Sequence, residues 1–151
     1  MDYLDFGKFL TYTRKIHDYI KKELNNAVRE YQISNTHIQL LLVLGNYEEG
    51  ISMHMLSELM YVDNALVTRS IKDLEQLGFL FRNRKTVKER KYRICLTEKG
   101  QKLKVHLEEV TNKIWNNLKS HFTDEELSLM RQTVKILEYK YDEIIEREKI
   151  C

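Results

Sequence analysis

Apolar residues recur at spacings of three and four through the first thirty residues of the chain. Phe6, Phe9, Ile16 and Leu24 all belong to this stripe. Because an α-helix turns once every 3.6 residues, side chains at these spacings lie along one of its faces. The pattern therefore predicts a single long helix over residues 4–31.

Three shorter helices are predicted next, each introduced by a residue whose side chain can cap it. Ser34, Ser52 and Asp63 carry oxygen atoms that can accept from the backbone N–H groups of a first turn. The first of these helices is expected over residues 37–47. The third is expected to end at Gly78, where the backbone commonly takes φ > 0. The outward face of this third helix is formed by small, hydroxyl and basic residues: Ala65, Thr68, Arg69 and Lys72.

Beyond Gly78 the apolar period changes from helical to alternating. Residues 79–81 lead into a charged segment, after which Tyr92, Ile94 and Leu96 alternate with other side chains. Two short strands joined by a charged tip are therefore predicted. The tip has no Asn-Gly pair, which favours a longer loop over a tight turn.

Two long helices are predicted at the C-terminal end. Thr97 can cap a helix over residues 98–120, and Thr123 with Glu126 matches a capping box before a helix over residues 124–147. The chain contains no proline, a residue that removes a backbone donor and breaks helices. The predicted fold class is mainly α with a small β-hairpin, an α+β arrangement in a single domain.

Positive charge is concentrated in the predicted hairpin. The segment 82–93 carries seven basic side chains and one acidic one, a net charge of +6. The whole chain carries +2, so the remainder carries −4. Short runs rich in Lys and Arg are weak motifs on their own, since most are solvated faces. Beside a helix with a polar outward face, the same run favours binding to phosphates.

The order of these elements is that of a winged helix-turn-helix. Two short helices are separated by a joint at residues 61–63, and the hairpin follows as the wing. An α-helix fits the major groove of B-form DNA, where each base pair presents its own pattern of donors and acceptors. The predicted DNA-binding residues lie on these two helices and on the hairpin: Ser52, His54, Asn64, Ala65, Thr68, Arg69, Lys72, Arg82, Arg84, Lys85, Lys88 and Arg90.

Residues 63–103 resemble the core of the MarR family of bacterial regulators. The resemblance is carried by Val67-Thr68-Arg69, by Leu74, by Leu77-Gly78, by Arg82, and by Arg90 ahead of Leu-Thr-Glu-Lys-Gly at 96–100. With the order of the helices, it covers nearly the whole chain. It implies a dimeric winged helix-turn-helix repressor, often released from DNA by a small ligand or an oxidant. It also implies groove contacts from Thr68 and Arg69 and makes Arg90 the wing arginine.

One position in the wing departs from the family pattern. The family usually has an acid two residues before the wing arginine, and this chain has Lys88 there, with Glu89 alongside. An acid at that place would orient the neighbouring arginines. The effect of the lysine on the geometry of the wing does not follow from the sequence.

The winged module, residues 34–97, is too small to cover the apolar stripes of three long helices. Soluble monomers rarely tolerate so long an exposed apolar patch. Residues 1–33 and 98–151 are therefore expected to form dimerisation helices with a second copy of the chain; the alternative is a monomeric helical bundle. A two-fold dimer would set two groove-reading helices about 34–36 Å apart, one turn of DNA, and so match a palindrome.

Regulation by a small molecule, a metal or an oxidant stays open from the sequence. The weak candidates for an effector pocket are Phe9, Tyr12 and His17. Aromatic residues on a helical stripe are more often core, and no effector is implied. His106 and Glu109 form a helical pair with metal-ligand spacing, but no second histidine accompanies them. Cys95 has basic neighbours, yet its strand position favours a buried apolar role over an oxidant sensor.

Other classes of function find little support. The chain has no glycine-rich phosphate loop and no nucleophile with a plausible base, so neither an enzyme nor a cofactor or resident metal is expected. No apolar run reaches about 18 residues and the start does not resemble a secretory signal, which favours a cytoplasmic protein without a membrane helix. The expected partners are double-stranded DNA, a second copy of the chain and, if one exists, a small-molecule effector. The main rival is a winged-helix module that binds protein.

Overall fold

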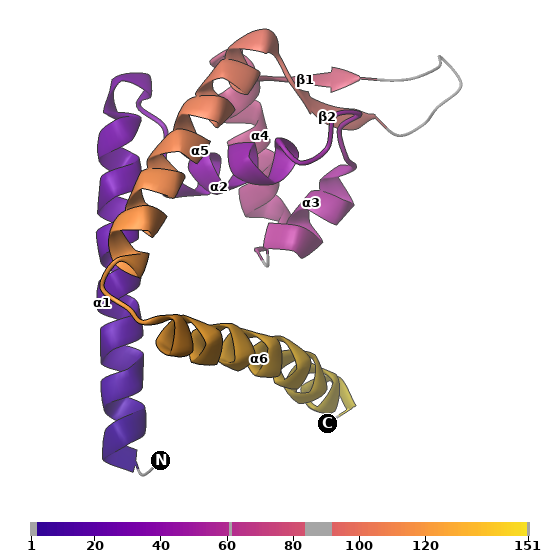
Figure 1. The fold of residues 1–151 in the computed structure, drawn as a ribbon. Coiled ribbons are helices and arrows are strands. Elements are labelled where there is room, and N and C mark those ends of the chain that lie inside the picture. Colours follow the sequence, from indigo (N-terminus) through magenta and orange to yellow (C-terminus); the bar gives the residue numbers. More distant parts are fainter. Residues whose placement is uncertain (1–2, 61, 84–91, 151) are drawn as a thin grey trace. The chain divides into compact units, whose positions relative to one another are not determined.

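The computed structural model describes residues 3–60, 62–83 and 92–150, without the side chains of residues 3, 142 and 144–150. The fold is mainly helical with one two-stranded hairpin, which confirms the predicted class (Figure 1). In chain order the elements are α1 (Tyr3–Ala27), the 3-10 turn η1 (Arg29–Tyr31), α2 (Asn35–Leu44), α3 (Met53–Met60), α4 (Asn64–Gln76), β1 (Leu80–Asn83), β2 (Arg93–Leu96), α5 (Glu98–Lys119) and α6 (Asp124–Ile150).

The chain divides into two compact units, residues 1–112 and residues 113–151. The first unit contains α1 to α4, the hairpin and most of α5. The second contains the end of α5 and the whole of α6. All the residues predicted to bind DNA belong to the first unit.

Side-chain caps begin the short helices as the sequence predicts. The Ser34 hydroxyl accepts from the His37 amide at 3.4 Å, and the Ser34 amide donates back to His37 Nδ1 at 3.0 Å. Ser52 accepts from the Met55 amide at 3.2 Å. Asp63 accepts from the first turn of α4 at 2.9 Å. Each cap satisfies a donor that the helix itself leaves unpaired.

The first helix is shorter than predicted. α1 ends at Ala27, and η1 follows, closed by the Tyr31 amide donating to the Val28 carbonyl at 3.0 Å. Gln32 then takes a left-handed conformation with φ 52°. The bend buries Val28 and sets the Tyr31 ring edge-on to Phe79, with ring centres 5.7 Å apart. The helix therefore ends just before the segment in which Tyr31 packs against a residue far along the chain. Helical periodicity does not predict such a contact, which is why the predicted end was wrong.

α2 is the central helix of the first unit. It ends at Leu44 rather than at the predicted Tyr47, because the chain turns there and the Gly50 amide donates to the Tyr47 carbonyl at 2.9 Å. Its near-continuous apolarity is explained by burial on several sides. Every helix and strand of the first unit contributes to its apolar core, and η1 contributes nothing. The buried apolar side chains are Leu24, Val28, Ile33, Ile38, Leu40, Leu41, Leu44, Ile51, Leu56, Val67, Ile71, Leu74, Phe79, Leu80, Ile94, Cys95, Leu103 and Leu107.

A polar contact also joins α2 to α4. His37 Nε2 lies 3.5 Å from the carboxylate of Asp73. The other ring nitrogen, Nδ1, accepts from the Ser34 amide. A neutral imidazole can accept at one nitrogen and donate at the other, so the His37 ring links the start of α2 to the second half of α4.

The hairpin pairs as the alternating pattern predicts. β1 and β2 are antiparallel, with Leu80 opposite Leu96. Ile51 adds an isolated bridge to Ile94 of β2, with two backbone N···O distances of 3.2 and 2.8 Å. The expected longer loop at the tip falls on residues 84–91, which lie outside the described residues.

Hydrogen bonds join the end of α4 to the start of α5. The Thr97 hydroxyl donates to the Gly78 carbonyl at 2.7 Å, and the Thr97 amide donates to the Phe79 carbonyl at 3.0 Å. Lys99 Nζ donates to the Leu77 carbonyl at 2.7 Å. Thr97 also caps α5, as predicted, by accepting from an amide of its first turn at 3.1 Å. We call these contacts the α4–α5 joint.

The second unit consists largely of α6. Its predicted capping box is present, because the Thr123 amide donates to Glu126 Oε2 at 2.9 Å and the Glu126 amide donates to the Thr123 hydroxyl at 3.2 Å. The helix begins at Asp124 as predicted and runs on to Ile150. Among the described residues, no helix combines the length and the apolarity needed to cross a bilayer.

Two glycines at the α4–α5 joint allow a graded test of its packing. Gly78 has φ +78° and open space around it, so an alanine there costs only the left-handed strain, about 1–2 kcal/mol of unfolding free energy. At Gly100 an added Cβ would lie 2.1 Å from the carbonyl oxygen of Phe79. We expect Gly100→Ala to lower the midpoint of thermal unfolding, followed by circular dichroism, clearly more than Gly78→Ala. Equal shifts would contradict the close approach of the two segments.

Candidate nucleic-acid interface

α4 presents two different faces, as its sequence predicts. One face is buried and contains Val67, Ser70, Ile71 and Leu74. The other is exposed to solvent and contains Asn64, Ala65, Thr68, Arg69 and Lys72. Neither Arg69 nor Lys72 forms an ion pair with another residue in the described part of the chain. Both positive charges therefore remain uncompensated by their immediate surroundings.

Hydrogen bonds hold the start of α4 against α3. The Thr68 hydroxyl lies 2.6 Å from the Asn64 carbonyl oxygen and 3.3 Å from the sulfur of Met53. The Ser57 hydroxyl donates to Asn64 Oδ1 at 2.6 Å. The proton of Thr68 is thus used inside the protein, which leaves its oxygen as an acceptor. The amide NH₂ of Asn64 keeps its donors for another partner.

The two candidates at α3 have different surroundings. Ser52 is half-buried, and its hydroxyl oxygen accepts the hydrogen bond that caps α3. His54 is exposed, with Nε2 lying 3.5 Å from the carboxylate of Glu58 one turn further along. The acid offsets any positive charge on His54, so this histidine adds less attraction for phosphates than Arg69 does.

Arg82 is held by other side chains. Nε and Nη2 donate to the two carboxylate oxygens of Glu75 at 2.8 and 3.0 Å, and Nη1 donates to the Tyr92 hydroxyl at 2.7 Å. The bond to Glu75 raises the pKa of the Arg82 guanidinium above its ordinary value. Its charge is compensated within the protein. The other hairpin candidates lie outside the described residues: Arg84, Lys85, Lys88 and Arg90.

Sequence reasoning missed Glu75 and Tyr92. The alternating pattern assigns Tyr92 only to a strand, and no predicted site includes Glu75. Their common partner is Arg82, which lies on a different element from Glu75 and at the opposite side of the hairpin from Tyr92. The sequence does contain one signal for Glu75. An acid in the last turn of a helix is disfavoured by the helix dipole, which indicates that a basic partner stabilises it.

The three effector candidates lie on the surface of α1. Phe9 and Tyr12 are exposed, and the Tyr12 ring centre lies 5.1 Å from Lys15 Nζ. His17 Nδ1 lies 3.6 Å from the carboxylate of Asp18. None of the three lines the cavity that the first unit contains beside the α4–α5 joint.

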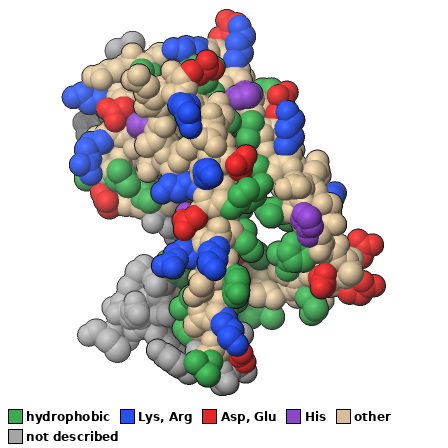
Figure 2. All heavy atoms as spheres, turned by 90° about the vertical axis from the view of Figure 1, so that its left-hand side faces the viewer, with side chains coloured by type: hydrophobic (Ala, Val, Ile, Leu, Met, Phe, Trp, Pro, Cys, Tyr) green, Lys and Arg blue, Asp and Glu red, His purple; other side chains and the backbone are tan. Residues whose placement is uncertain are grey.

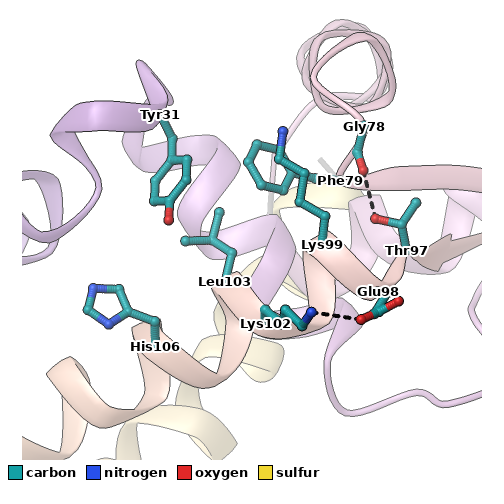
Figure 3. A pocket seen from close by; sticks show the side chains of 9 residues that line it. All are labelled: Tyr31, Gly78, Phe79, Thr97, Glu98, Lys99, Lys102, Leu103 and His106. Atoms are coloured by element: carbon teal, nitrogen blue, oxygen red, sulfur yellow. Dashed lines mark hydrogen bonds and ion pairs between the residues drawn. The ribbon is translucent and has the colours of Figure 1, made fainter.

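This cavity has a volume of about 590 Å³, a size suited to a small ligand (Figure 3). Tyr31, Phe79 and Leu103 form its apolar wall, and His106 stands at its rim. Lys99 Nζ lies 4.4 Å from the centre of the Phe79 ring. The cavity is thus bounded by η1, the α4–α5 joint and α5, so its shape depends on how the end of α4 is held.

Cys95 is buried in β2, as the strand position predicts. Burial raises the pKa of its thiol, and the nearby charge of Arg93 offsets only part of the rise. The sulfur lies 3.7 Å from the carbonyl oxygen of Glu49. Because the thiolate is the form that oxidants attack, these surroundings disfavour a redox-sensing role for Cys95.

The metal-spaced pair His106 and Glu109 gains no further ligands. Within the residues that the structure describes, no three His, Cys, Asp or Glu side chains are grouped closely enough to hold an ion. His106 instead borders the cavity beside Tyr31 (Figure 3). The described residues therefore give the metal-responsive alternative no support.

Known proteins are similar to this chain in sequence and in fold. The family model for the transcriptional regulator SarA/Rot matches residues 15–107, more than half of the chain. The chain belongs to the SarA/Rot family of transcriptional regulators. The SarA/Rot match includes α4 and the whole hairpin segment, and it stops short of α6.

Individual relatives agree with the SarA/Rot assignment. The HTH-type transcriptional regulator SarZ of Staphylococcus aureus (strain USA300) is 31% identical over 97 residues, which are 64% of this chain and 65% of SarZ. The match spans just under two thirds of the length of that relative. A MarR transcriptional regulator from Methanosarcina mazei Go1 is 27% identical, with a TM-score of 0.76 over 95% of this chain and 94% of that chain.

A third comparison concerns a protein solved with DNA. FabT of Streptococcus pneumoniae, in a crystal structure with DNA, has a TM-score of 0.79 over 95% of this chain and 99% of its own, at 21% identity. The resemblance to MarR regulators inferred from the sequence is confirmed. Membership in the SarA/Rot family does not by itself say which side chains of this chain contact DNA, so the residue assignments stay predictions.

The burial of Cys95 predicts slow reaction with thiol reagents. In a Cys151→Ser variant Cys95 is the one remaining cysteine, and its raised pKa keeps it mainly protonated near neutral pH. We expect labelling by Ellman's reagent near pH 7.5 to be at least about tenfold slower in the folded protein than in urea. The rate should keep rising beyond the pH range in which an ordinary thiol ionises. Equal rates in the two states would show an accessible, ordinary thiol.

Proposed function

We propose that the chain is a sequence-specific DNA-binding regulator that acts as a homodimer on palindromic operators and represses transcription. The observation that carries the proposal is the solvent-facing side of α4, where Ala65, Thr68, Arg69 and Lys72 are exposed while the opposite side is buried. A helix fixed in the core along one face and open along the other is what reading of the major groove requires.

The side chains on the exposed face of α4 would make different kinds of contact with DNA. Ala65 lets the helix backbone approach the bases, and the uncompensated charges of Arg69 and Lys72 attract phosphates or the acceptor edge of guanine. The amide of Asn64 and the oxygen of Thr68 supply a donor and an acceptor near the helix start. The basic hairpin tip would add phosphate contacts beside the groove, so affinity should fall steeply as salt rises.

Proteins of the same fold support this mode of binding. Crystal structures with DNA exist for FabT and for MepR of Staphylococcus aureus, at 21% and 16% identity to this chain. At such identities the shared fold supports the general placement of a winged helix on a duplex. The individual contacts proposed for this chain rest on its own exposed residues.

α1 gives the strongest indication of a second copy. Its apolar stripe is covered toward the C-terminal end, where Leu24 is 8% exposed, and open toward the N-terminal end, where Phe6 is 49% and Ile16 is 44% exposed. Figure 2 shows hydrophobic side chains at the surface of the molecule on the side that carries α1. A second α1 related by a two-fold axis would cover the open part and be covered in return.

α6 is a further candidate for the dimer surface. Large apolar side chains are exposed along it: Leu129, Met130, Val134, Ile136, Leu137, Tyr139 and Tyr141. These belong to the region 98–151 that the sequence assigns to dimerisation. A stripe of this kind supports an intertwined dimer rather than a monomer, because one copy of the chain leaves it in water.

A small effector would act through the dimer geometry. By favouring a dimer whose two reading helices no longer match one turn of DNA, it would release the operator. We place its site at the cavity beside the α4–α5 joint rather than at Phe9, Tyr12 and His17, because the cavity walls include residues that hold the end of α4. In this role the protein is not an enzyme, and it acts in the cytoplasm, where the duplex is.

Loss of the Arg69 charge tests the reading face. With a duplex recovered by selection from random sequences, Arg69→Ala should weaken binding in fluorescence anisotropy by about 1–3 kcal/mol. If Arg69 binds phosphate, the slope of log affinity against log salt should also shrink by about 1. The matched control is Arg29→Ala, which removes the same charge from η1 and should change affinity little. Absence of salt-dependent binding to any duplex would instead favour the protein-interaction alternative.

An acid on the open stripe of α1 tests the dimer. Ile16→Asp should convert the protein from dimer to monomer in sedimentation at micromolar concentration, because the interface would bury a lone carboxylate. The same variant should lose more affinity for a palindrome than for a single half-site. Arg14→Asp places an acid on the other side of the same helix and should leave the dimer intact. A wild-type protein that sediments as a monomer would remove the dimer from the proposal.

A further inference from the structure

The last turn of α4 and both sides of the hairpin meet at one guanidinium group. Arg82, on β1, grips the carboxylate of Glu75 with two parallel hydrogen bonds of 2.8 and 3.0 Å. Its third nitrogen, Nη1, donates to the Tyr92 hydroxyl at 2.7 Å, and the guanidinium carbon lies 4.8 Å from the centre of the Tyr92 ring. We call these three residues the hairpin bracket.

The pair at the centre of the bracket is partly withdrawn from water. The side chains of Arg82 and Glu75 are 38% and 24% exposed. Glu75 stands in the last turn of α4, where the helix dipole disfavours a negative charge. The carboxylate is therefore stabilised by Arg82 and not by its own helix. A forked pair of this kind also fixes the relative direction of the two groups, because both hydrogen bonds must be aligned at once.

The bracket lies where the hairpin most needs a fixed direction. Each strand has only four residues, and a two-stranded hairpin is marginally stable by itself. Arg82 is the second-last residue of β1, and Tyr92 directly precedes β2. On the second strand Arg93 Nη1 donates to the Gly50 carbonyl at 3.0 Å, which ties that strand to the segment before α3. The base of the basic tip is thus anchored at both strands.

We propose that Arg82 is a positioning residue, which holds the two strands of the hairpin in a fixed direction relative to α4, rather than a residue that itself binds phosphate. The inference rests on the proposed DNA-binding function and assigns Arg82 a different part in it. α4 and the tip must reach neighbouring stretches of one duplex at the same time. A hairpin whose strands are already fixed loses less conformational freedom on binding, which favours affinity.

The negative charge of Glu75 disfavours direct binding of a phosphate by the Arg82 guanidinium. Three of its five N–H groups are used within the bracket. To present the fork to a phosphate, Arg82 would release Glu75 and leave a partly withdrawn carboxylate unpaired beside an approaching anion. Loss of the forked hydrogen bonds would not be offset by the single new contact to a phosphate, because the anion would also meet the freed Glu75 charge. We therefore expect the bracket to stay closed in the complex with DNA.

Removal of the Glu75 charge distinguishes phosphate binding by Arg82 from positioning by Arg82, because the two roles predict opposite changes in DNA affinity. If Arg82 binds phosphate, Glu75→Gln frees its guanidinium and removes a repelling charge, so affinity for the selected duplex should rise. If Arg82 is a positioning residue, Glu75→Gln loosens the hairpin, and affinity should fall about tenfold, the equivalent of one charge-assisted hydrogen bond. Glu58→Gln is the matched control, because it removes an acid from α3 without touching the bracket. It should leave affinity unchanged or raise it.

Three further variants test the bracket, and two of them, Arg82→Lys and Tyr92→Phe, leave its charge unchanged. Arg82→Lys keeps the positive charge but cannot grip Glu75 and Tyr92 together, so it should lose affinity about as much as Glu75→Gln does. Tyr92→Phe removes the hydrogen bond that the Arg82 guanidinium donates to the Tyr92 hydroxyl and should lower affinity about threefold to tenfold. The salt slope should be unchanged in both, since no phosphate contact is lost. Full affinity in Arg82→Lys, or a smaller salt slope in Arg82→Gln, would overturn the positioning role.

A measurement without DNA keeps the inference testable on its own. Hydrogen exchange of the amides in β1 and β2 should become faster in Glu75→Gln, while exchange in α2 stays as in the parent protein. Unchanged exchange in the hairpin overturns the bracket whether or not the protein binds DNA. A parent protein that ignores every duplex, together with faster hairpin exchange in the variant, contradicts the proposed function and overturns Arg82's part in it.

Discussion

The burial of one side of α4 is the constraint on which the rest of the first unit depends. Val67, Ile71 and Leu74 are withdrawn from water among the residues of α2 and α3. An α-helix cannot hide one face without presenting the opposite one, because its side chains are fixed at 100° intervals. The hydrophobic effect therefore aims Arg69 and Lys72 outward, although it acts on neither of them. Caps at Ser34, Ser52 and Asp63 then fix where each neighbouring helix begins.

Local rules were sufficient to predict most of this fold. Periodicity located the helices and the hairpin, and cap chemistry placed Ser34, Ser52 and Asp63 correctly because each acts within one helical turn. Periodicity failed where distant residues decide. The end of α1 accompanies the contact of Tyr31 with Phe79, nearly fifty residues later. The SarA/Rot match shows the family, while the DNA contacts and the tip residues beyond Asn83 stay predictions.

Counting basic residues overstates what a basic segment offers to a ligand. The segment 82–93 carries +6 by sequence, but Arg82 spends its charge on Glu75, a residue of another element. Arg69 stands alone in a less basic stretch and keeps its full charge facing solvent. Which positive charges are available depends on partners that only the folded chain brings together. Sequence spacing alone could not have paired Glu75 with Arg82, since a turn and a change of element separate them.

The close approach at Gly100 has a mechanical consequence. With the α5 backbone resting on the Phe79 carbonyl and Thr97 and Lys99 bonded across the same seam, the two segments have almost no freedom to slide. Packed interiors resist small deformation and pass strain on to their neighbours. A rotation of the first turns of α5 would therefore move the end of α4 with it, because the contacts between the two segments would absorb little of the motion.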